Sequence, residues 1–312
     1  MKASRSALIC AWSIAFHAWS LCLGYNIQGA ESESGAVPDS RDAVIRITSP
    51  APASVITDYE VLVRGVLHVP PRIEIGVTVN GRTALVYGGE FATIVPPATE
   101  MTAIARDAMG TTLARCSIPV TLQAPTSEPP VNLQPAHPTG GTAPFTETFS
   151  VSTGVPVTTM SFDARGDGHA DYQGTKLPKY EFTYKQPGLY FPTVTVNGTY
   201  RAVRLVRVFT KDELDVPLQK KWKAFKAALR RGYVEDAMQY VTIDKRASYR
   251  TMFNALTIPL KDINRILTDI TFVKQDGFSV DYEMTGLEDG KRWSSLVRFV
   301  LDLDGIWRLR FV

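Results

Sequence analysis

The chain has 312 residues, of which 45% are hydrophobic and 21% charged, so it is long enough for two or three separate cores and is neither a disordered nor a coiled-coil sequence. The formal net charge is only +3, and no long run of Lys and Arg appears. These features exclude an extended nucleic-acid-binding surface and predict no nucleic-acid partner.

The first thirty residues have the three-part pattern of a secretory signal peptide. Lys2 and Arg5 precede an apolar run, and a small-residue segment ends at Ala30. We expect residues 1–30 to be cleaved and the protein to be exported, to the periplasm, the cell surface or the medium. The alternative is a retained membrane anchor, because the apolar run approaches the length that spans a bilayer. No later segment is predicted to span one.

Residues 43–123 alternate short β-branched runs with turn signals. Asn80-Gly81 is a two-residue hairpin signal, and Ala108-Met109-Gly110 also indicates a tight turn. About seven strands at this spacing predict an antiparallel β-sandwich. The stretches "VTVNGRTALV" and "MTAIARDAMGTT" resemble the bacterial immunoglobulin-like modules of extracellular enzymes and surface proteins. The resemblance covers nearly all of the segment and rests on strand and turn residues.

Residues 124–143 are rich in Pro and include two adjacent Gly, which predicts an extended linker. A second β-rich segment, 144–210, follows and carries "SFDARGDGHADY" and "YEFTYKQPGLYFPTVTV" at a fixed offset. Together they resemble the PKD domain, the polycystic-kidney-disease repeat, which implies a second β-sandwich. The residues that match its turn and its corner are Phe162, Gly166, Asp167, Gly168, Tyr184, Pro187, Gly188 and Tyr190. The chain departs from that family at Ala164-Arg165, where an aromatic residue is usual.

Three carboxylates, Asp163, Asp167 and Asp171, are evenly spaced in the glycine-rich loop of this segment. One hypothesis is a calcium site, because calcium takes six to eight oxygen ligands from closely spaced carboxylates and carbonyls. The other is a metal-free turn, in which Asp side chains accept backbone N–H groups and Gly takes positive φ. Arg165 favours the turn, because calcium loops usually place an oxygen ligand there. Calcium is the one cofactor that the sequence suggests.

The hydrophobic period becomes helical near residue 213 and drops to two after residue 270. Gly232 is expected to end the first helix, and Asp304-Gly305 is expected to form a turn between strands. Three helices are predicted from three apolar sets: Trp222, Phe225 and Leu229; Tyr249, Met252, Phe253 and Leu256; and Ile263, Ile266, Leu267 and Ile270.

Helices followed by long antiparallel strands that end in "DGIWRLRFV" resemble the nuclear transport factor 2-like fold, a cone of curved sheet closed by helices. Asp304, Gly305, Trp307 and Arg308 match the terminal motif of that family, and the resemblance covers residues 213–312. The fold hosts enzymes and non-catalytic proteins, so it does not determine function.

Two sets of residues are candidates for chemistry or contact in this last segment. Asp281 and Glu283 are candidates for a carboxylate-only catalytic site, but they alternate with an apolar face and are expected to face solvent. No His lies in the segment, and no nucleophile, metalloprotease or phosphate-loop motif occurs in the chain. A basic helix face could contact an anionic surface, or its charges could simply be solvated. Its residues are Lys221, Trp222, Lys223, Lys226 and Arg230.

The sequence therefore predicts a multidomain, mainly β protein with two tandem antiparallel β-sandwiches followed by an α+β cone-shaped domain. We expect a non-catalytic binding, scaffold or adhesion protein of a bacterial envelope or secretome, with a protein or polysaccharide partner. The alternatives are an accessory or catalytic component of a secreted polymer-degrading system, and a small-molecule binder that uses the interior of the cone. A deep apolar cavity in the cone would favour the binder, and a cone filled by side chains would exclude it.

Overall fold

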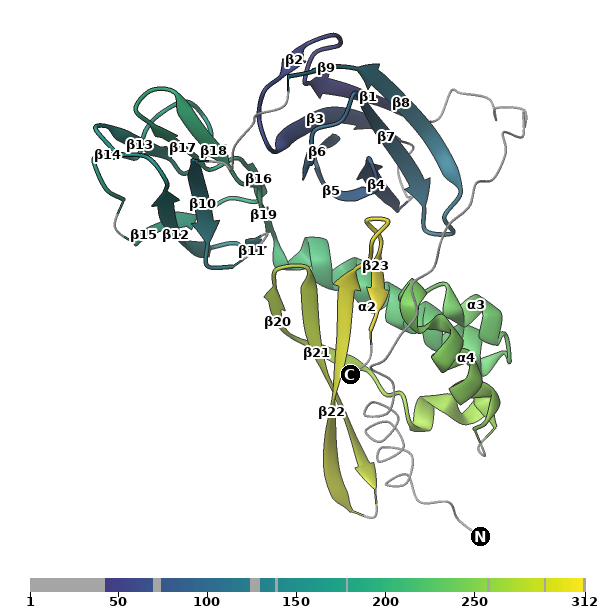
Figure 1. Cartoon of the computed structure of the whole chain (residues 1–312). Coiled ribbons are helices and arrows are strands. Elements are labelled where there is room, and N and C mark those ends of the chain that lie inside the picture. The colour runs from purple at the N-terminus through teal and green to yellow at the C-terminus, as the bar shows by residue number, and fades with distance from the viewer. Residues whose placement is uncertain are drawn as a thin grey trace.

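The computed structural model describes residues 43–69, 74–123, 130–137, 140–177, 179–256, 259–288 and 290–310. The chain is mainly β, with several antiparallel sheets and one group of helices (Figure 1). The predicted signal peptide, residues 1–30, lies outside the described residues. Within the described ranges, no helix is both long enough and apolar enough to cross a membrane.

The first part of the chain is a seven-stranded sandwich. Its strands are β1 (Val44–Ser49), β3 (Val61–His68), β4 (Ile75–Val79), β5 (Arg82–Tyr87), β6 (Glu90–Val95), β7 (Glu100–Asp107) and β8 (Thr112–Pro119); β2 (Val55–Ile56) and β9 (Thr121–Leu122) form a short parallel pair. The strands pair in the order β1-β3-β6-β5-β4-β7-β8, in which β1-β3-β6-β5 and β4-β7-β8 have the orders of the two layers of an immunoglobulin-like sandwich. The predicted Ig-like β-sandwich is confirmed.

The β4–β5 hairpin joins the two layers through the turn that the sequence predicted. Asn80 has φ 46° and Gly81 has φ 77°. Two successive positive φ values are those of a type I′ turn, whose twist matches the twist of the flanking strands. The hydrophobic core between the layers contains residues such as Val63, Val77 and Phe91, which are 0–1% exposed.

The second β-rich part has three small sheets around one core. Its strands are β10 (Val131–Pro135), β11 (Gly140–Thr142), β12 (Phe145–Thr153), β13 (Met160–Asp163), β14 (Tyr172–Gly174), β15 (Tyr180–Tyr184), β16 (Gly188–Tyr190), β17 (Thr193–Val196), β18 (Tyr200–Val203) and β19 (Val206–Phe209). The sheet orders are β10-β12-β15, β11-β19-β16 and β14-β13-β17-β18. Phe149 and Phe162, both fully buried, pack with ring centroids 5.1 Å apart in this core.

The predicted linker 124–143 is too long, because its later half forms strands. β10 pairs with β12, and β11 pairs with β19. Pro is tolerated in β10 because β10 is an edge strand. One side of an edge strand pairs with no other strand, so an N–H is not needed there. The fully buried Glu147 carboxylate accepts the backbone N–H groups of Ala136 at 2.9 Å and His137 at 3.1 Å, which fixes the chain after the strand.

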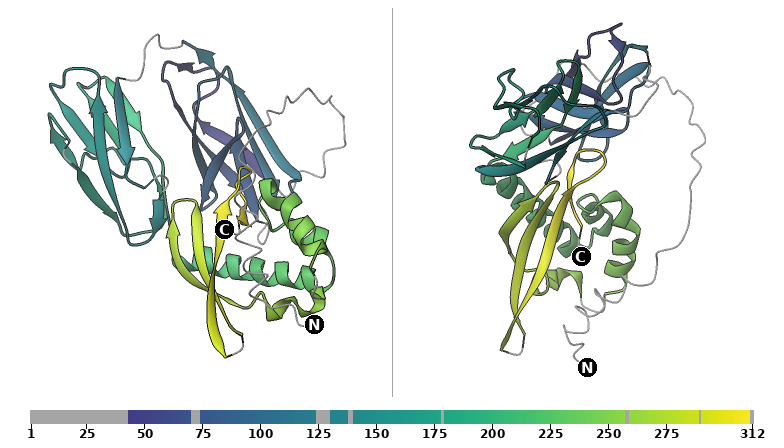
Figure 2. Two further views of the ribbon diagram at one scale, coloured as in Figure 1. Left: turned by 60° about the horizontal axis from the view of Figure 1, so that its bottom comes forward. Right: turned by 60° about the vertical axis from the view of Figure 1, so that its left-hand side comes forward.

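The first sandwich and the second β-rich part also touch each other and lie side by side (Figure 2), and the second part leads through β19 into α2 (Lys211–Arg230). Arg204 Nη1 lies 2.6 Å from Glu60 Oε2. The Arg64 guanidinium carbon lies 4.4 Å from the ring centroid of Phe191. The two parts are therefore packed together and not held apart by a spacer.

The last part combines helices with a four-stranded antiparallel sheet. Its elements are α2, α3 (Val234–Met238), α4 (Arg246–Asn254), the 3-10 helices η1 (Ile243–Lys245) and η2 (Leu260–Arg265), and strands β20 (Ile270–Asp276), β21 (Ser279–Glu288), β22 (Lys291–Leu301) and β23 (Trp307–Leu309). A capping box starts α2, because Thr210 and Glu213 each accept the other's backbone N–H. The helix ends before Gly232, at φ 81°, as predicted.

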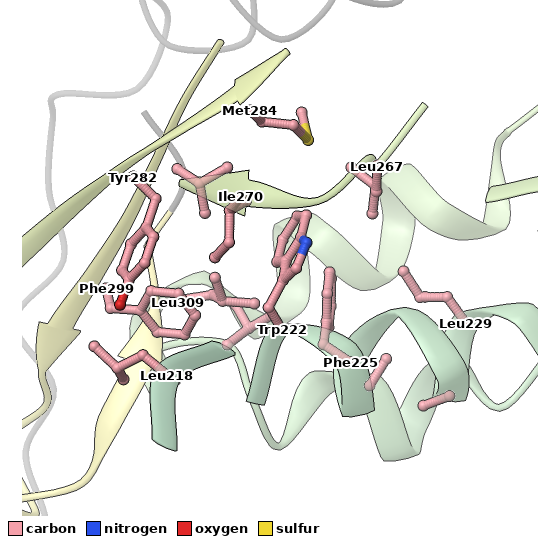
Figure 3. Packing of buried hydrophobic residues seen from close by; sticks show 14 of the residues in the cluster. Leu218, Trp222, Phe225, Leu229, Leu267, Ile270, Tyr282, Met284, Phe299 and Leu309 are labelled. Carbon is pink, nitrogen blue, oxygen red and sulfur yellow. The ribbon is translucent and has the colours of Figure 1, made fainter. Parts of the chain in front are cut away.

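The helix α2 lies across one face of this sheet and fills the space against it (Figure 3). Trp222 and Phe225 from the helix meet Tyr282 and Phe299 from the strands, and all four are fully buried. One helix prediction was wrong, and one short helix was missed. The third predicted helix is only the 3-10 helix η2, because its last apolar residue, Ile270, belongs to strand β20, and the short α3 was not predicted.

Candidate functional site: a cleft where three parts of the chain meet

A cleft of about 470 Å³ lies where the first sandwich, strand β19 and the α2–β23 region meet. Leu85 and Val86 of β5 form one wall, Phe209 lies at the end of β19, and Lys220 and Trp307 line the α2–β23 side. Its size falls within the roughly 300–1,000 Å³ usual for ligand pockets, which occur preferentially at domain interfaces. This cleft is our candidate functional site.

The turn between β22 and β23 docks onto the first sandwich (Figure 1), and its residues Gly305 and Ile306 line the cleft. The Thr83 hydroxyl in β5 donates a hydrogen bond of 2.8 Å to the Leu303 carbonyl oxygen. Gly76 in β4 lies so close to the turn that a Cβ there would stand 2.0 Å from the Asp304 carbonyl oxygen. Only glycine at position 76 permits this approach.

Arg308 fixes the shape of that turn from inside. Its guanidinium donates to Asp302 Oδ2 at 2.9 Å and to Asp304 Oδ1 at 2.6 Å, and it reaches the Ala108 carbonyl oxygen of the first sandwich at 3.4 Å. Burial alone would raise the pKa of Asp304, but the hydrogen bonds and charge of Arg308 outweigh burial and hold that pKa below its usual value. The motif that resembles the terminal strand of the cone family is thus part of an interface between domains.

Lys221 joins α2 to the first sandwich close to the same turn. Its Nζ lies 2.7 Å from Glu74 Oε1 and also donates to the Trp307 carbonyl oxygen. Burial lowers the pKa of the Lys221 ammonium, and the Glu74 carboxylate offsets part of that effect. The Lys221 charge therefore forms an ion pair inside the protein.

Arg207 closes the cleft where all three parts meet. Its guanidinium carbon lies 4.4 Å from the Tyr87 ring centroid and 4.0 Å from that of Phe209, a cation–π arrangement on both sides. It also donates to the Val86 carbonyl oxygen at 3.3 Å and pairs with Glu213 at 3.3 Å. Burial lowers the pKa of Arg207, while Glu213 opposes that shift.

The five residues of the predicted basic surface are not brought together. Trp222 is fully buried, and its indole donates to the Thr268 carbonyl oxygen at 2.8 Å. Lys226 is 8% exposed and pairs with Asp269 at 3.0 Å, and Lys221 pairs with Glu74. Of the five residues, only Lys223 and Arg230 are exposed. The prediction was wrong because α2 covers a sheet, so the helix face with Trp222 faces inward.

The three aspartates of the glycine-rich loop bind its backbone. Asp163 accepts from the N–H groups of Arg165 at 3.1 Å, Gly166 at 2.7 Å and Gly168 at 2.7 Å. Asp171 accepts from Ala164 N at 2.8 Å, and Arg165 pairs with Asp167 at 2.9 Å. No cluster of three or more His, Cys, Asp or Glu suited to a metal ion occurs among the described residues. Calcium binding by this loop stays a prediction, and a calcium titration tests it.

Asp281 does not face solvent, which corrects the sequence prediction. It is 6% exposed, and Arg298 donates to its two carboxylate oxygens at 2.6 and 3.0 Å. The register of β21 and β22 places these two residues opposite each other, so the guanidinium covers the carboxylate. Glu283 is exposed as expected and accepts a hydrogen bond of 2.7 Å from Ser294. The two carboxylates do not form a common site.

No protein-family model matches the chain, and no curated protein matches it. Among solved structures, it is similar to a modular endo-beta-1,4-mannanase from Cellulomonas fimi, at 21% identity over 27% of this chain and 19% of that chain, with a TM-score of 0.22. It is also similar to the fibronectin(III)-like modules of Clostridium thermocellum CbhA, at 13% identity over 54% and 94% of the two chains (TM-score 0.20). The D00-D0 domain of intimin matches at 10% identity over 53% and 97% (TM-score 0.18). Scores of this size identify no family, so function has to be argued from the site.

Proposed function

We propose that this protein is an exported, non-catalytic binding or scaffold protein of a bacterial envelope or secretome, whose cleft contacts a protein or a polysaccharide. The observation that carries the proposal is the construction of the cleft. Three parts of the chain form its walls, and the ion pairs Lys221–Glu74 and Arg207–Glu213 hold them in place. Such preorganisation reduces the entropy lost on binding.

The lining of the cleft is suited to binding a ligand and less suited to proton transfer. No His or Cys is among its described lining residues, and its buried cations, Arg207 and Lys221, are each paired with a carboxylate. His is the group that most often takes and gives protons near neutral pH. A binding role therefore fits the lining better than a catalytic one.

The order of export signal, Ig-like sandwich, PKD-like segment and nuclear transport factor 2-like segment supports the same proposal, because such β-modules accompany extracellular and surface proteins. An accessory or catalytic role in a secreted polymer-degrading system is the second candidate, and a hydrolysis assay on envelope polymers tests it. A small-molecule site inside the cone is disfavoured, since Trp222, Phe225 and Tyr282 fill the space between sheet and helix.

The proposal is tested with the full-length chain produced in its own host. Mass spectrometry should find an N-terminus near Glu31, and the purified protein should co-sediment with isolated envelope. Protease treatment of the envelope removes a protein partner, and periodate treatment destroys a polysaccharide partner. A protein that keeps Met1 in the cytoplasm, or that never co-sediments with untreated envelope, would refute the proposal.

A further inference from the structure

We infer that the cleft binds an uncharged stretch of a glycan chain, with the sugar hydroxyls held by Gln239 and Tyr240 and a sugar face packed against Trp307. This inference rests on the proposed binding function and deepens it, because it names the class of ligand and the residues that contact it. It follows from which polar groups of the cleft already have an ion-pair or hydrogen-bond partner within the protein and which do not.

The two largely buried cations of the cleft each have a carboxylate partner. Lys221 pairs with Glu74 at 2.7 Å, and Arg207 pairs with Glu213 at 3.3 Å. An anionic ligand that bound to Lys221 or Arg207 would have to break that cation's pair, which leaves a carboxylate without its partner. Lys220 also lines the cleft, but it is exposed and solvated. The interior therefore favours a neutral ligand.

Three neutral polar groups of the lining have no hydrogen-bond partner among the described residues. They are the side-chain amide of Gln239, the hydroxyl of Tyr240 and the indole N–H of Trp307. Burial raises the pKa of Tyr240, so its hydroxyl keeps its proton and can donate at neutral pH. Amide and hydroxyl groups both donate and accept hydrogen bonds, as sugar hydroxyls do. A purely apolar ligand would leave all three groups unpaired, at a cost.

The apolar part of the lining suits the C–H face of a sugar ring. Trp307 is half-buried and meets Phe209 edge to face, with ring centroids 6.2 Å apart. Pro217 and Ala224 of α2 also line the cleft. The lining extends along α2 from Glu213 to Ala224, which at about 1.5 Å per residue is roughly 16 Å. That length fits a short stretch of a chain better than a single sugar.

Calorimetric titration of the full-length protein tests the inference. The neutral probes are β-1,4-linked hexasaccharides of glucose, of mannose and of N-acetylglucosamine, and the acidic probe is α-1,4-linked hexagalacturonate. We expect at least one neutral probe to bind and the acidic probe to bind more weakly. Gln239→Ala and Tyr240→Phe should each weaken binding by roughly fivefold to tenfold, the effect of one hydrogen bond.

A matched pair of helix variants controls for folding. Ala224→Arg places a long side chain into the cleft and should abolish binding, whereas Ala227→Arg, at another half-buried alanine of α2 outside the lining, should not. Melting temperatures of both variants verify that they fold. A failure of every neutral probe to bind, or tighter binding of hexagalacturonate, overturns the inference.

The inference can fail while the proposed function stands. If the wild-type chain co-sediments with envelope and Ala224→Arg does so equally well, the binding surface lies elsewhere and the cleft assignment is wrong. If the wild-type chain does not co-sediment with untreated envelope at all, the proposed function fails.

Discussion

The Thr83 hydroxyl donates a hydrogen bond of 2.8 Å to the Leu303 carbonyl oxygen, 220 residues later in the chain. The contact fastens the β22–β23 turn to β5 of the first sandwich. Because residues of both β5 and the turn line the cleft, its shape depends on the docking of the turn. Changes at the docking surface should therefore affect stability and cleft geometry together.

Replacing Gly76 with Ala should destabilise the protein by about 2 kcal/mol, the usual cost of forcing an extra methyl group into a packed contact. The new Cβ would stand 2.0 Å from the Asp304 carbonyl oxygen, which is main chain and cannot rotate away. Urea denaturation measures the loss. Gly154→Ala is the control, because a Cβ there meets its nearest atom at 3.9 Å and should change little. Equal stability of Gly76→Ala and wild type would show that the turn does not dock as described.

Replacing Arg308 with Leu should cost roughly 3–5 kcal/mol, because it leaves the Asp302 and Asp304 carboxylates buried without a cation. Arg310→Leu is the matched control two residues away. The Arg310 side chain is 48% exposed and pairs with Asp244 at 3.3 Å, so its loss should stay within about 1 kcal/mol. Chemical denaturation of both variants gives the comparison, and similar losses would contradict the assigned role of Arg308.

The pair of Asp304 and Arg308 also predicts a pH dependence. The pKa of Asp304 is lowered in the folded protein, whereas an unfolded Asp has a pKa of about 3.9. The unfolded state therefore binds the proton more readily, so this stabilisation is complete above about pH 4 and is lost as the pH falls through the folded value. Asp304→Asn should lower stability at pH 7 and make its decline below pH 4 shallower.

Denaturation curves at a series of pH values measure this effect. Asp58→Asn, at an exposed position of the first sandwich, serves as the control and should keep the wild-type decline. An Asp304→Asn variant whose stability falls with pH as steeply as the wild type would assign the acid sensitivity to other groups.

Features that depend on a few neighbouring residues could be predicted from the sequence. The Asn80-Gly81 turn requires positive φ values that these residue types adopt, and Gly232 ends α2 for the same reason. The strands of the first sandwich were likewise predicted from short alternating runs and turns, although their order was not. In each case the signal and the structure it determines lie in one short segment.

The candidate site could not be predicted, because the contacts that assemble it, such as Lys221 with Glu74 and Thr83 with Leu303, join segments far apart in the chain. Arg207 and Glu74 carry no local signal that distinguishes them from solvated charges. Lys221 and Trp222 looked like one basic, aromatic surface, yet their neighbours are Glu74 and the sheet under α2. Packing between domains decides which charges are paired, and periodicity along a single helix does not contain that information.

The loop of three aspartates gives the last prediction. Asp163 accepts three backbone N–H groups, and Arg165 lies against Asp167 and Asp171, so the carboxylates already have donors and a cation. We expect millimolar calcium to leave the melting temperature of the full-length protein unchanged. Asp163→Ala should cost about 1–3 kcal/mol without calcium, since it leaves the N–H groups of Gly166 and Gly168 without their acceptor.

Asp167→Ala separates the two hypotheses, because the Asp167 carboxylate is 44% exposed and accepts only the His169 N–H from the backbone of this loop. In a metal-free turn this variant should lose less stability than Asp163→Ala and should melt identically with and without calcium. A rise in the wild-type melting temperature at millimolar calcium that disappears in Asp167→Ala would establish a weak calcium site of the extracellular kind. Without that rise, the loop is a turn in which the carboxylates replace a metal by binding backbone donors and Arg165.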